Sequence, residues 1–319
     1  MASEFDLIAK HFAKPAAPGQ LGVGDDCALF SIPPGRQVAT STDLLVEGRH
    51  FYPDVDPRAL GHKALAVNLS DLAAMGAQPV GCLLGLALPQ ADDAWLAAFA
   101  QGFHDLASAA GCPLIGGDTT RSPRLLTLSI TVFGSVEPAK ALRRDAARAG
   151  DDIWVSGELG AADIAYRLLD GQLPADPQRL AAVRRALEWP APQLALGMAL
   201  AGVAHAAIDI SDGLLQDLGH ILDLSRVGAE LHYGMLPVAS ALDGLDEATR
   251  RRAVLGGGDV YELCFTAAPA VRAQVLLAAG EAGVRVSRVG RITADSGLLV
   301  LDETGRPLPD LPQGFDHFA

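Results

Sequence analysis

Segments with the periodicity of a β-strand alternate with segments typical of an α-helix along almost the whole chain, and this alternation restricts the possible folds most. Residues 124–136 alternate leucine, isoleucine and valine with serine and threonine, as a half-buried strand does. Residues 60–77 place apolar side chains three and four positions apart, as an amphipathic helix does. Further strands are expected at 36–45, 81–89 and 113–118, with another helix at 92–111. This order predicts an α/β domain.

A polar, basic stretch separates this half of the chain from a second half of the same character. The stretch, 137–150, reads EPAKALRRDAARAG and is the expected hinge. We predict an α/β (α+β) fold of two domains with mixed sheets: an N-terminal domain at 1–137, a hinge at 138–150 and a C-terminal domain at 151–319. In the second domain we expect a strand after residue 151, helices at 161–170, 177–188, 192–204 and near 269–283, a strand, turn and helix over 205–225, and strands near 284–301.

Charge and hydropathy exclude several classes of partner. The formal net charge of −13 disfavours nucleic acid and anionic membrane surfaces. No apolar run reaches the roughly 18 residues that a membrane span needs, and the N-terminus lacks the apolar core of a signal peptide. The four cysteines, Cys27, Cys82, Cys112 and Cys264, form no paired ligand motif and are expected to be buried free thiols. These features predict a cytoplasmic protein.

Aspartates next to Gly, Ser or Thr recur where apolar segments end. A buried carboxylate without a partner is costly, and lysine and arginine are scarce in these motifs, so either water or a metal ion must compensate the charge. Oxygen ligands without His or Cys favour Mg²⁺ or Ca²⁺ over zinc, and no compact calcium loop is present. Several Mg²⁺ ions around a nucleoside triphosphate suit such scattered carboxylates. The candidates are Asp25, Asp26, Asp43, Asp71, Asp118, Asp209 and Asp212.

Each of these aspartates, taken alone, also suits an ordinary structural role. Asp43, Asp71 or Asp118 could cap a helix or stabilise a turn, and Ser211 or Asp212 could cap the helix that follows SDG. The GDD at 150–152 precedes a plain strand and is interpreted as a turn. The sequence has neither a Walker A motif nor a glycine-rich kinase loop, so another segment would have to bind a triphosphate. The metal hypothesis therefore depends on the number and similar placement of the motifs.

The chain resembles thiamine-monophosphate kinases in five segments that occur in the same order: GDDCA, STDLLVEGRHF, KALAVNLSDLAAMGA, GGDTTR and AIDISDGLLQDLGHI. This family belongs to the superfamily of aminoimidazole ribonucleotide synthetase-like ATP-binding enzymes. The resemblance implies a two-domain α/β fold, N-terminal domains that pair in a homodimer, and ATP in a cleft near the dimer interface. It also implies direct transfer of the γ-phosphate of ATP to thiamine monophosphate, the final step of thiamine diphosphate biosynthesis.

The resemblance also assigns roles to individual residues. The implied Mg²⁺ ligands are Asp26, Ser41, Thr42, Asp43, Asp71, Asp118, Asp209 and Asp212, of which Asp43 and Asp212 are taken as catalytic. The implied nucleotide contacts are Gly117, Asp118, Arg144 and Ser211, and the implied substrate contacts are His50, Asp259 and Phe315, with Phe318 as the alternative to Phe315. We expect Asp26 to reach the metal cluster from the end of a buried segment, with Cys27, Ala28 and Leu29 in the core beside it.

Two departures from the family pattern concern the acceptor pocket. The family motif GGEDYEL reads GGDVYEL at 257–263, so that Asp259 replaces a glutamate and Val260 replaces an aspartate. Asp259 keeps a hydrogen-bond acceptor but is shorter by one methylene. The tryptophan that some members carry near the C-terminus has no counterpart in LPDLPQGF.

Other functions make different demands on the sequence. A selenophosphate synthetase should carry a reactive cysteine before the GDD motif, and a hydrogenase-maturation homologue should end in cysteine. Here the first cysteine is Cys27 and the chain ends DHFA. An amidine-forming ribonucleotide synthetase should lack VEGRHF. A calcium-stabilised binding protein without turnover should show a secretion signal and a compact aspartate-rich loop.

Overall fold

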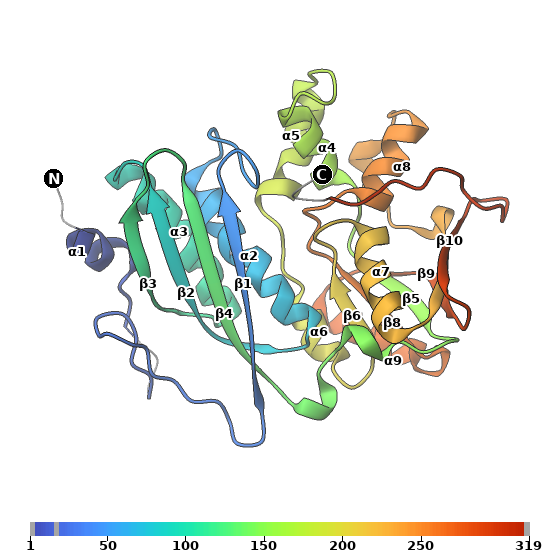
Figure 1. Cartoon of the computed structure of the whole chain (residues 1–319), viewed down its shortest axis with the longest axis horizontal. Coiled ribbons are helices and arrows are strands. Elements are labelled where there is room, and N and C mark those ends of the chain that lie inside the picture. The colour runs from blue at the N-terminus through green and yellow to red at the C-terminus, as the bar shows by residue number, and fades with distance from the viewer. Residues whose placement is uncertain (1–3, 16–18, 316–319) are drawn as a thin grey trace. The chain divides into compact units, whose positions relative to one another are not determined.

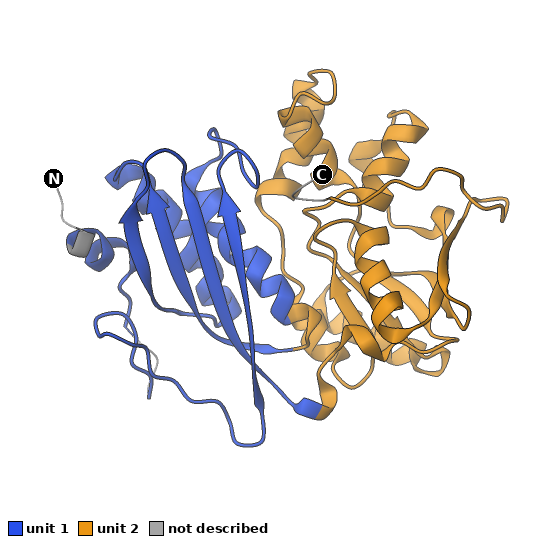
Figure 2. Ribbon diagram, viewed as in Figure 1, with its two compact units in different colours: residues 1–72, 77–138 blue, residues 73–76, 139–319 orange. Residues whose placement is uncertain are grey.

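The computed structural model describes residues 4–15 and 19–315 and divides the chain into two compact units (Figure 2). Unit 1 comprises residues 1–72 and 77–138, and unit 2 comprises residues 73–76 and 139–319. The expected hinge carries two short 3₁₀ turns, η2 (Pro138–Lys140) and η3 (Arg144–Ala146). From Ala139 onward this stretch belongs to unit 2.

Unit 1 contains a four-stranded sheet in the order β1-β4-β2-β3. β4 pairs antiparallel with both β1 and β2, whereas β3 pairs parallel with β2, so the sheet is mixed as predicted. The strands are β1 (Gln37–Val46), β2 (Gln78–Leu88), β3 (Leu114–Arg121) and β4 (Thr127–Val136). The helices are α1 (Glu4–Leu7), the π-helix η1 (Ile8–Phe12), α2 (Pro57–Ala74), whose last two residues are assigned to unit 2, and α3 (Asp93–Ala110).

The alternation read from residues 124–136 becomes the two faces of this sheet. Leu128, Ile130 and Val132 of β4 are fully buried, and the residues between them are partly exposed. Figure 1 shows α2 and α3 together on one face of the sheet. α3 begins where the Asp92 side chain accepts the backbone N–H of Trp95 and ends at Gly111 in the left-handed conformation, so both ends have local sequence signals.

Unit 2 contains a six-stranded mixed sheet in the order β10-β7-β9-β5-β8-β6, in which only β10 and β7 pair in parallel. The strands are β5 (Asp152–Ser156), β6 (Ala206–Asp209), β7 (Gly228–His232), β8 (Leu263–Ala267), β9 (Val286–Thr293) and β10 (Gly297–Leu301). The helices are α4 (Ala161–Leu169), α5 (Pro177–Glu188), α6 (Leu194–Leu200), α7 (Leu214–Ser225), α8 (Glu247–Gly256) and α9 (Arg272–Ala282), with 3₁₀ turns η4 (Tyr233–Met235), η5 (Ser240–Leu242) and η6 (Pro269–Val271).

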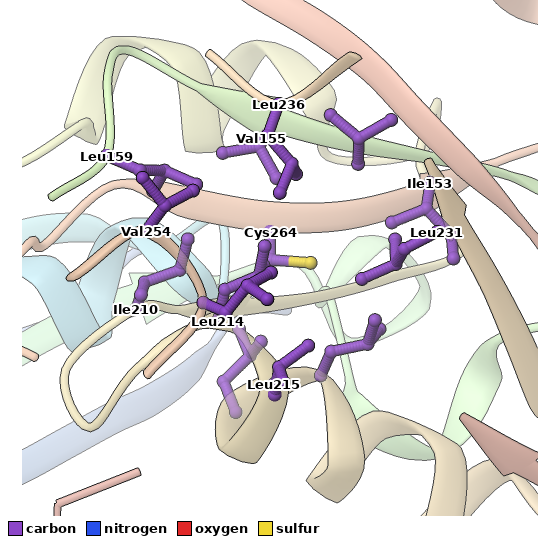
Figure 3. Close-up of a cluster of buried hydrophobic side chains, with 14 of the residues drawn as sticks. Ile153, Val155, Leu159, Ile210, Leu214, Leu215, Leu231, Leu236, Val254 and Cys264 are labelled. Carbon is purple, nitrogen blue, oxygen red and sulfur yellow. The ribbon is translucent and has the colours of Figure 1, made fainter. Parts of the chain in front are cut away.

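Both faces of this sheet are covered, because alternate residues of the same strands enter two different cores. On one face Ile153, Val155 and Cys264 pack with Leu214 and Leu218 of α7, and Figure 3 shows Cys264 within this cluster. On the other face Trp154 and Phe265 stack and pack with residues of α6 and α9. Such two-sided burial explains why these strands are almost continuously apolar in sequence.

Apart from the 3₁₀ turns, three elements of unit 2 were missed by the sequence analysis: α8, β7 and β8. α8 carries the run of three arginines Arg250–Arg252 and buries only its last turn, so the apolar periodicity that identifies a helix is weak. β7 is five residues long and ends in a histidine, and its position in the sheet depends on pairing with β9 and β10. Among the described helices, none combines the length and the apolar character that crossing a bilayer requires.

The segment GDDCALF does not end a buried segment, and the prediction that Cys27 and Leu29 lie in the core is wrong. Leu21 and Leu29 exchange backbone hydrogen bonds across an isolated bridge, which makes residues 21–29 a surface turn. Cys27 is exposed, and Leu29 is 63% exposed, whereas Cys82, Cys112 and Cys264 are buried as expected. Apolar residues predict burial only where an element covers them, and no strand of the sheet includes this turn.

Candidate functional site

The polar motifs of unit 1 meet where β1 lies against α2. Ser41 Oγ donates to Asp71 Oδ2 at 2.5 Å, and the backbone N–H of Asp43 donates to Asn68 Oδ1 at 3.0 Å. Asn68 is fully buried although it is polar. Since one face of β1 meets one face of α2, residues about 30 positions apart become neighbours. The structure thus brings together Ser41, Asp43 and Asp71, and the sequence analysis missed Asn68, which sits three residues before Asp71 in NLSD.

Thr42 lies between Ser41 and Asp43 in the chain, but its side chain points to the other face of the sheet. Its Oγ1 is 2.9 Å from both the Ile130 carbonyl, to which it donates, and Thr131 Oγ1 on β4. Successive side chains of a strand point to opposite faces, so Thr42 does not share the face of Ser41 and Asp43. The backbone of Thr42 nevertheless joins those of Ser41 and Asp43.

Asp118 lies on the far edge of the same sheet. Asp43 pairs with Ile130, Ile130 with Leu84, and Leu84 with Gly117, so three strand spacings separate β1 from β3. At about 4.8 Å per spacing, Asp43 and Gly117 are roughly 14 Å apart. Within one chain, the exposed Asp118 therefore does not join Asp43 and Asp71.

Gly117 has a structural requirement of its own. Its φ is +153°, and a Cβ there would lie 2.0 Å from the Leu84 carbonyl oxygen. β3 can approach β2 this closely only with glycine at 117. A role of Gly117 beside the nucleotide, which the resemblance implies, is additional to this packing.

Asp25 and Asp26 lie exposed in the surface turn 21–29. The backbone N–H of Asp26 donates to Asp25 Oδ1 at 2.9 Å, which fixes the Asp25 carboxylate against the backbone of Asp26. Asp25 thus supports the backbone of Asp26, and a metal ion could approach Asp26 from solvent.

The predicted residues of unit 2 meet around Ser211 and Asp212. The backbone N–H of Asp259 donates to the Ser211 carbonyl at 2.8 Å, and the N–H of Phe315 donates to the Asp212 carbonyl at 2.9 Å. Asp209 is buried at the end of β6, two residues before Ser211. Ser211, Asp212, Asp259 and Phe315, from three distant parts of the chain, therefore form one group. Phe318 lies outside the described residues.

Glycines permit this close approach of segments. Gly213 has a φ of +119°, and a Cβ there would meet the backbone of Gly256 at 2.7 Å. A Cβ on Gly258 would lie 2.5 Å from the Ser211 carbonyl oxygen. Gly258 and the glycine of SDG are thus explained by the contact between these two segments.

Neither Ser211 nor Asp212 caps α7. Instead Asp217 Oδ2 accepts the backbone N–H groups of Asp212 and Gly213, each at 3.0 Å. Burial, together with the negative charges of Asp212 and Asp209, raises the pKa of Asp217 to about 8. The capping function therefore belongs to a residue that the sequence analysis missed.

Arg144 lies apart from this group. Its carbonyl accepts Ser225 Oγ at 2.8 Å, which fixes its backbone at the C-terminal end of α7. Ser211 and Asp212 precede the other end of the same helix. Twelve residues of helix span about 18 Å, which exceeds the reach of an arginine side chain. Unit 2 therefore does not bring Arg144 to Ser211.

A second acidic residue missed by the sequence analysis is Glu262, directly before β8. Its carboxylate accepts Ser156 Oγ–H on one oxygen and Gln193 Nε2–H at 3.1 Å on the other. Burial raises the pKa of Glu262 to about 7, although both hydrogen bonds lower it. A Cβ on Gly157 would collide with the Glu262 carboxylate, so the sequence SG at 156–157 leaves the space that this carboxylate occupies.

Glu262→Gln should flatten the pH dependence of stability. The folded chain keeps the Glu262 proton up to about pH 7, whereas the unfolded chain releases it near its ordinary pKa of 4.5. The stabilisation linked to this proton is present below pH 4.5 and is lost as the pH rises through about 7. The loss is on the order of 3 kcal/mol. Urea unfolding at pH 5 and pH 8 should show a smaller decrease for the variant, and equal decreases would contradict this ionisation.

The donor atoms available at these motifs are all oxygens, which is the ligand type that Mg²⁺ prefers. Over residues 4–15 and 19–315, no three His, Cys, Asp or Glu side chains are clustered closely enough to hold a metal ion on their own. The residues present nevertheless fit Mg²⁺ in kind, since Asp43, Asp71, Asp209 and Asp212 supply carboxylates and Ser41 supplies a hydroxyl.

Comparison with known proteins gives a consistent result over the whole chain. The N-terminal domain family of AIR synthase related proteins matches residues 24–136, and the corresponding C-terminal domain family matches residues 148–302. The thiamine-monophosphate kinase of Escherichia coli K12 is 43% identical over 322 residues, which covers 99% of this chain and 98% of that protein.

Solved structures agree with these matches. The thiamine-monophosphate kinase from Stenotrophomonas maltophilia K279a is 45% identical, with a TM-score of 0.82 and coverage of 90% of this chain and 92% of that one. AaThiL, solved in complex with AMPPCP and TMP, is 27% identical, with a TM-score of 0.76 and coverage of 90% and 89%. The chain therefore belongs to the thiamine-monophosphate kinase family of AIR synthase related proteins.

Proposed function

We propose that the chain transfers the γ-phosphate of ATP to thiamine monophosphate, giving thiamine diphosphate and ADP. The observation that carries this proposal is the full-length identity of 43% to a thiamine-monophosphate kinase. A relative solved with AMPPCP and TMP supports the choice of both substrates. The meeting of Ser211, Asp212, Asp259 and Phe315 agrees with it, because residues that the resemblance implies to bind nucleotide adjoin residues that it implies to bind the acceptor.

Several Mg²⁺ ions are the proposed cofactor. In unit 1 the proposed ligands are Asp43, Asp71 and Ser41, with Asp26, Thr42 and Asp118 as further ligands. In unit 2 the proposed ligands are Asp209 and Asp212. Bound Mg²⁺ would neutralise the phosphate charge that increases in the transition state. The residues of the chain fix the ligand geometry: Ser41 of β1 orients Asp71 of α2, and Asp217 holds the backbone of Asp212. Gly117 and Ser211 are proposed to contact the nucleotide. Arg144 remains a candidate that the geometry of unit 2 does not support.

His50, Asp259 and Phe315 are the proposed acceptor contacts. Asp259 is held by its N–H bond to Ser211 and by the Tyr261 hydroxyl, which donates to Asp259 Oδ1 at 3.1 Å. Both Asp259 and Tyr261 have positive φ, of 58° and 55°. Non-glycine residues in this conformation are uncommon and gather at functional sites. The shortened side chain of Asp259 in GGDVYEL therefore belongs to a segment with an uncommon backbone conformation.

We also propose that the chain forms a homodimer through unit 1. The sheet face opposite α2 and α3 exposes Val38 at 51% and Leu44 at 62%, both on β1. Leu29 and Leu125 of the same unit are also exposed. Exposed apolar side chains on a sheet face favour pairing with a second copy. Pairing would also give a second chain the opportunity to supply Asp118, which lies far from Asp43 within one chain.

The test of the function is an assay of the purified protein with ATP, Mg²⁺ and thiamine monophosphate. We expect ADP and thiamine diphosphate in equal amounts, and no ADP with thiamine monophosphate absent. ADP formation with another acceptor but not with thiamine monophosphate would assign the chain a sister activity. Absence of ADP with every acceptor would favour a binding protein without turnover.

A further inference from the structure

Glu262 is an acidic residue that none of the roles above explains, and its carboxyl is largely shielded from water. One carboxyl oxygen accepts Gln193 Nε2–H at 3.1 Å, and the other accepts Ser156 Oγ–H. Both partners are neutral, so neither offsets a negative charge on the carboxyl as a cation would. An ionised carboxylate in such a place is costly, whereas a protonated one is not.

The Glu262 carboxyl joins three segments of unit 2. Ser156 ends β5 and is fully buried, and its Oγ also accepts the backbone N–H of Leu263 at 2.8 Å. Gln193 directly precedes α6. Gly157, with a φ of +60°, leaves the space that the carboxyl fills. The contacts of this one side chain therefore link the start of β8 to the end of β5 and to the start of α6.

The backbone directly before Glu262 has an uncommon conformation. Asp259 and Tyr261 have positive φ, and each such residue costs on the order of 1 kcal/mol or more unless its surroundings hold it in place. The N–H of Tyr261 donates to the Ile210 carbonyl, and the N–H of Ile210 donates to the Glu262 carbonyl, both at 2.8 Å. These bonds hold the segment Asp259–Tyr261 along β6. The Glu262 side chain holds the end of the same segment along β5.

The protonation state of Glu262 decides how well this anchor holds. Burial raises the pKa of Glu262 to about 7, and the negative charge of Glu158 acts in the same direction, against the hydrogen bonds from Ser156 and Gln193. Glu158 itself is exposed and paired with Arg285 at 3.1 Å. Below about pH 7 the Glu262 carboxyl is neutral and suits its neutral partners. Above that pH a negative charge is enclosed between them, and movement of the side chain toward water is favoured.

We propose that Glu262 is a positioning residue for the acceptor, which acts through the segment Asp259–Tyr261 and needs its own proton to do so. This inference rests on the proposed function, in which Asp259 contacts thiamine monophosphate. Release of the proton frees the end of the segment and weakens acceptor binding. By linkage, the bound acceptor favours the protonated carboxyl by the same factor. A purely structural role of Glu262 would make stability depend on pH but would not link acceptor binding to this proton.

Kinetics of Glu262→Gln test the positioning role. Glutamine keeps the shape and the neutral state of the protonated carboxyl, so its acceptor binding should not follow this ionisation. The measured quantity is the KM for thiamine monophosphate of the wild type divided by that of the variant. This ratio should rise about fivefold from about pH 6 to about pH 8.5. The corresponding ratio for ATP should stay within about twofold. Ionisation of the substrates cancels in both ratios, because both proteins bind the same compounds.

Glu281→Gln is the matched control, because Glu281 is an exposed glutamate of α9 in the same unit. Its KM for thiamine monophosphate should rise with pH as in the wild type. The same pH dependence in the wild type and in Glu262→Gln would refute the positioning role. Equal rises of both KM values with pH would refute it as well, because a general loosening of the fold affects both substrates.

The titration of Glu262 in the wild type gives a readout that needs no turnover. With ¹³C-labelled glutamate and saturating Mg²⁺ and AMPPCP, one side-chain carboxyl signal should titrate near pH 7 and be absent in Glu262→Gln. Thiamine monophosphate should raise this midpoint by about 0.7 pH unit, which corresponds to the fivefold change in affinity. A midpoint that does not move when the acceptor binds would overturn the proposal.

The outcomes separate the positioning role from the proposed function. If Glu262→Gln does not fold, the wild-type titration decides, because a midpoint near pH 7 sets Glu262 apart from glutamates of ordinary pKa. If the wild type forms no ADP from thiamine monophosphate, the proposed function fails. If ADP is formed and the midpoint does not move, only the role of Glu262 fails.

Discussion

Asp43→Asn should lower kcat by about 100-fold or more while the protein stays folded. Asparagine keeps the size of the side chain, and the Asp43 N–H bond to Asn68 Oδ1 does not involve the carboxylate. The lost negative charge weakens the proposed hold on Mg²⁺, and with it charge neutralisation at the phosphates, an effect of several kcal/mol, where about 1.4 kcal/mol is tenfold in rate. Steady-state kinetics, with thermal unfolding to verify the fold, give the measurement.

Asp105→Asn provides the comparison for this variant. Asp105 is an exposed carboxylate of α3, paired with Arg58 at 2.8 Å. Surface ion pairs contribute only about 0–1 kcal/mol, so this change should leave kcat within about twofold. A near wild-type rate for Asp43→Asn would remove Asp43, and with it the contact region between β1 and α2, from the catalytic site.

Removal of divalent cations should abolish ADP formation. With excess EDTA the proposed carboxylate ligands would face the triphosphate without a compensating charge, and like charges would repel one another. Activity should return when Mg²⁺ exceeds the chelator. Ca²⁺ should restore less, because its bonds are longer and its coordination less regular than those of Mg²⁺.

The binding of MgATP, measured apart from turnover, separates two causes of this loss. A nucleotide bound only with Mg²⁺ should raise the unfolding temperature when both are present and not when EDTA is added. Full ADP formation in EDTA would exclude the metal-dependent mechanism. A normal unfolding temperature with EDTA alone would show that the loss is not due to unfolding.

Local sequence patterns predicted most of the elements because periodicity depends on the covalent chain alone. The alternating residues of β4 and the capped α3 were both expected, and both are present. The turn 21–29 shows the limit of this reasoning. Its small and apolar residues suggested burial, but exposure depends on which other segments cover a residue, and Leu29 is left uncovered.

The candidate site was predicted as a set of residue types, and its internal contacts were not. Asp217 and Glu262 have the same appearance in sequence as other acidic residues on helix or strand flanks. Only the folded chain shows that one holds the backbone of Asp212 and that the other is enclosed by Ser156 and Gln193. The same holds for Arg144, which a twelve-residue helix separates from Ser211.

The sequence by itself determined the alternation of strands and helices, the two mixed α/β units and the oxygen-rich motifs, because each depends on short stretches of neighbouring residues. Tertiary structure decided which distant residues meet: Ser41 with Asp71, Asp259 with Ser211, and Glu262 with Ser156. The physical reason is that the hydrogen bonds and burial that fix these pairs form between segments far apart in the chain. No local pattern specifies them.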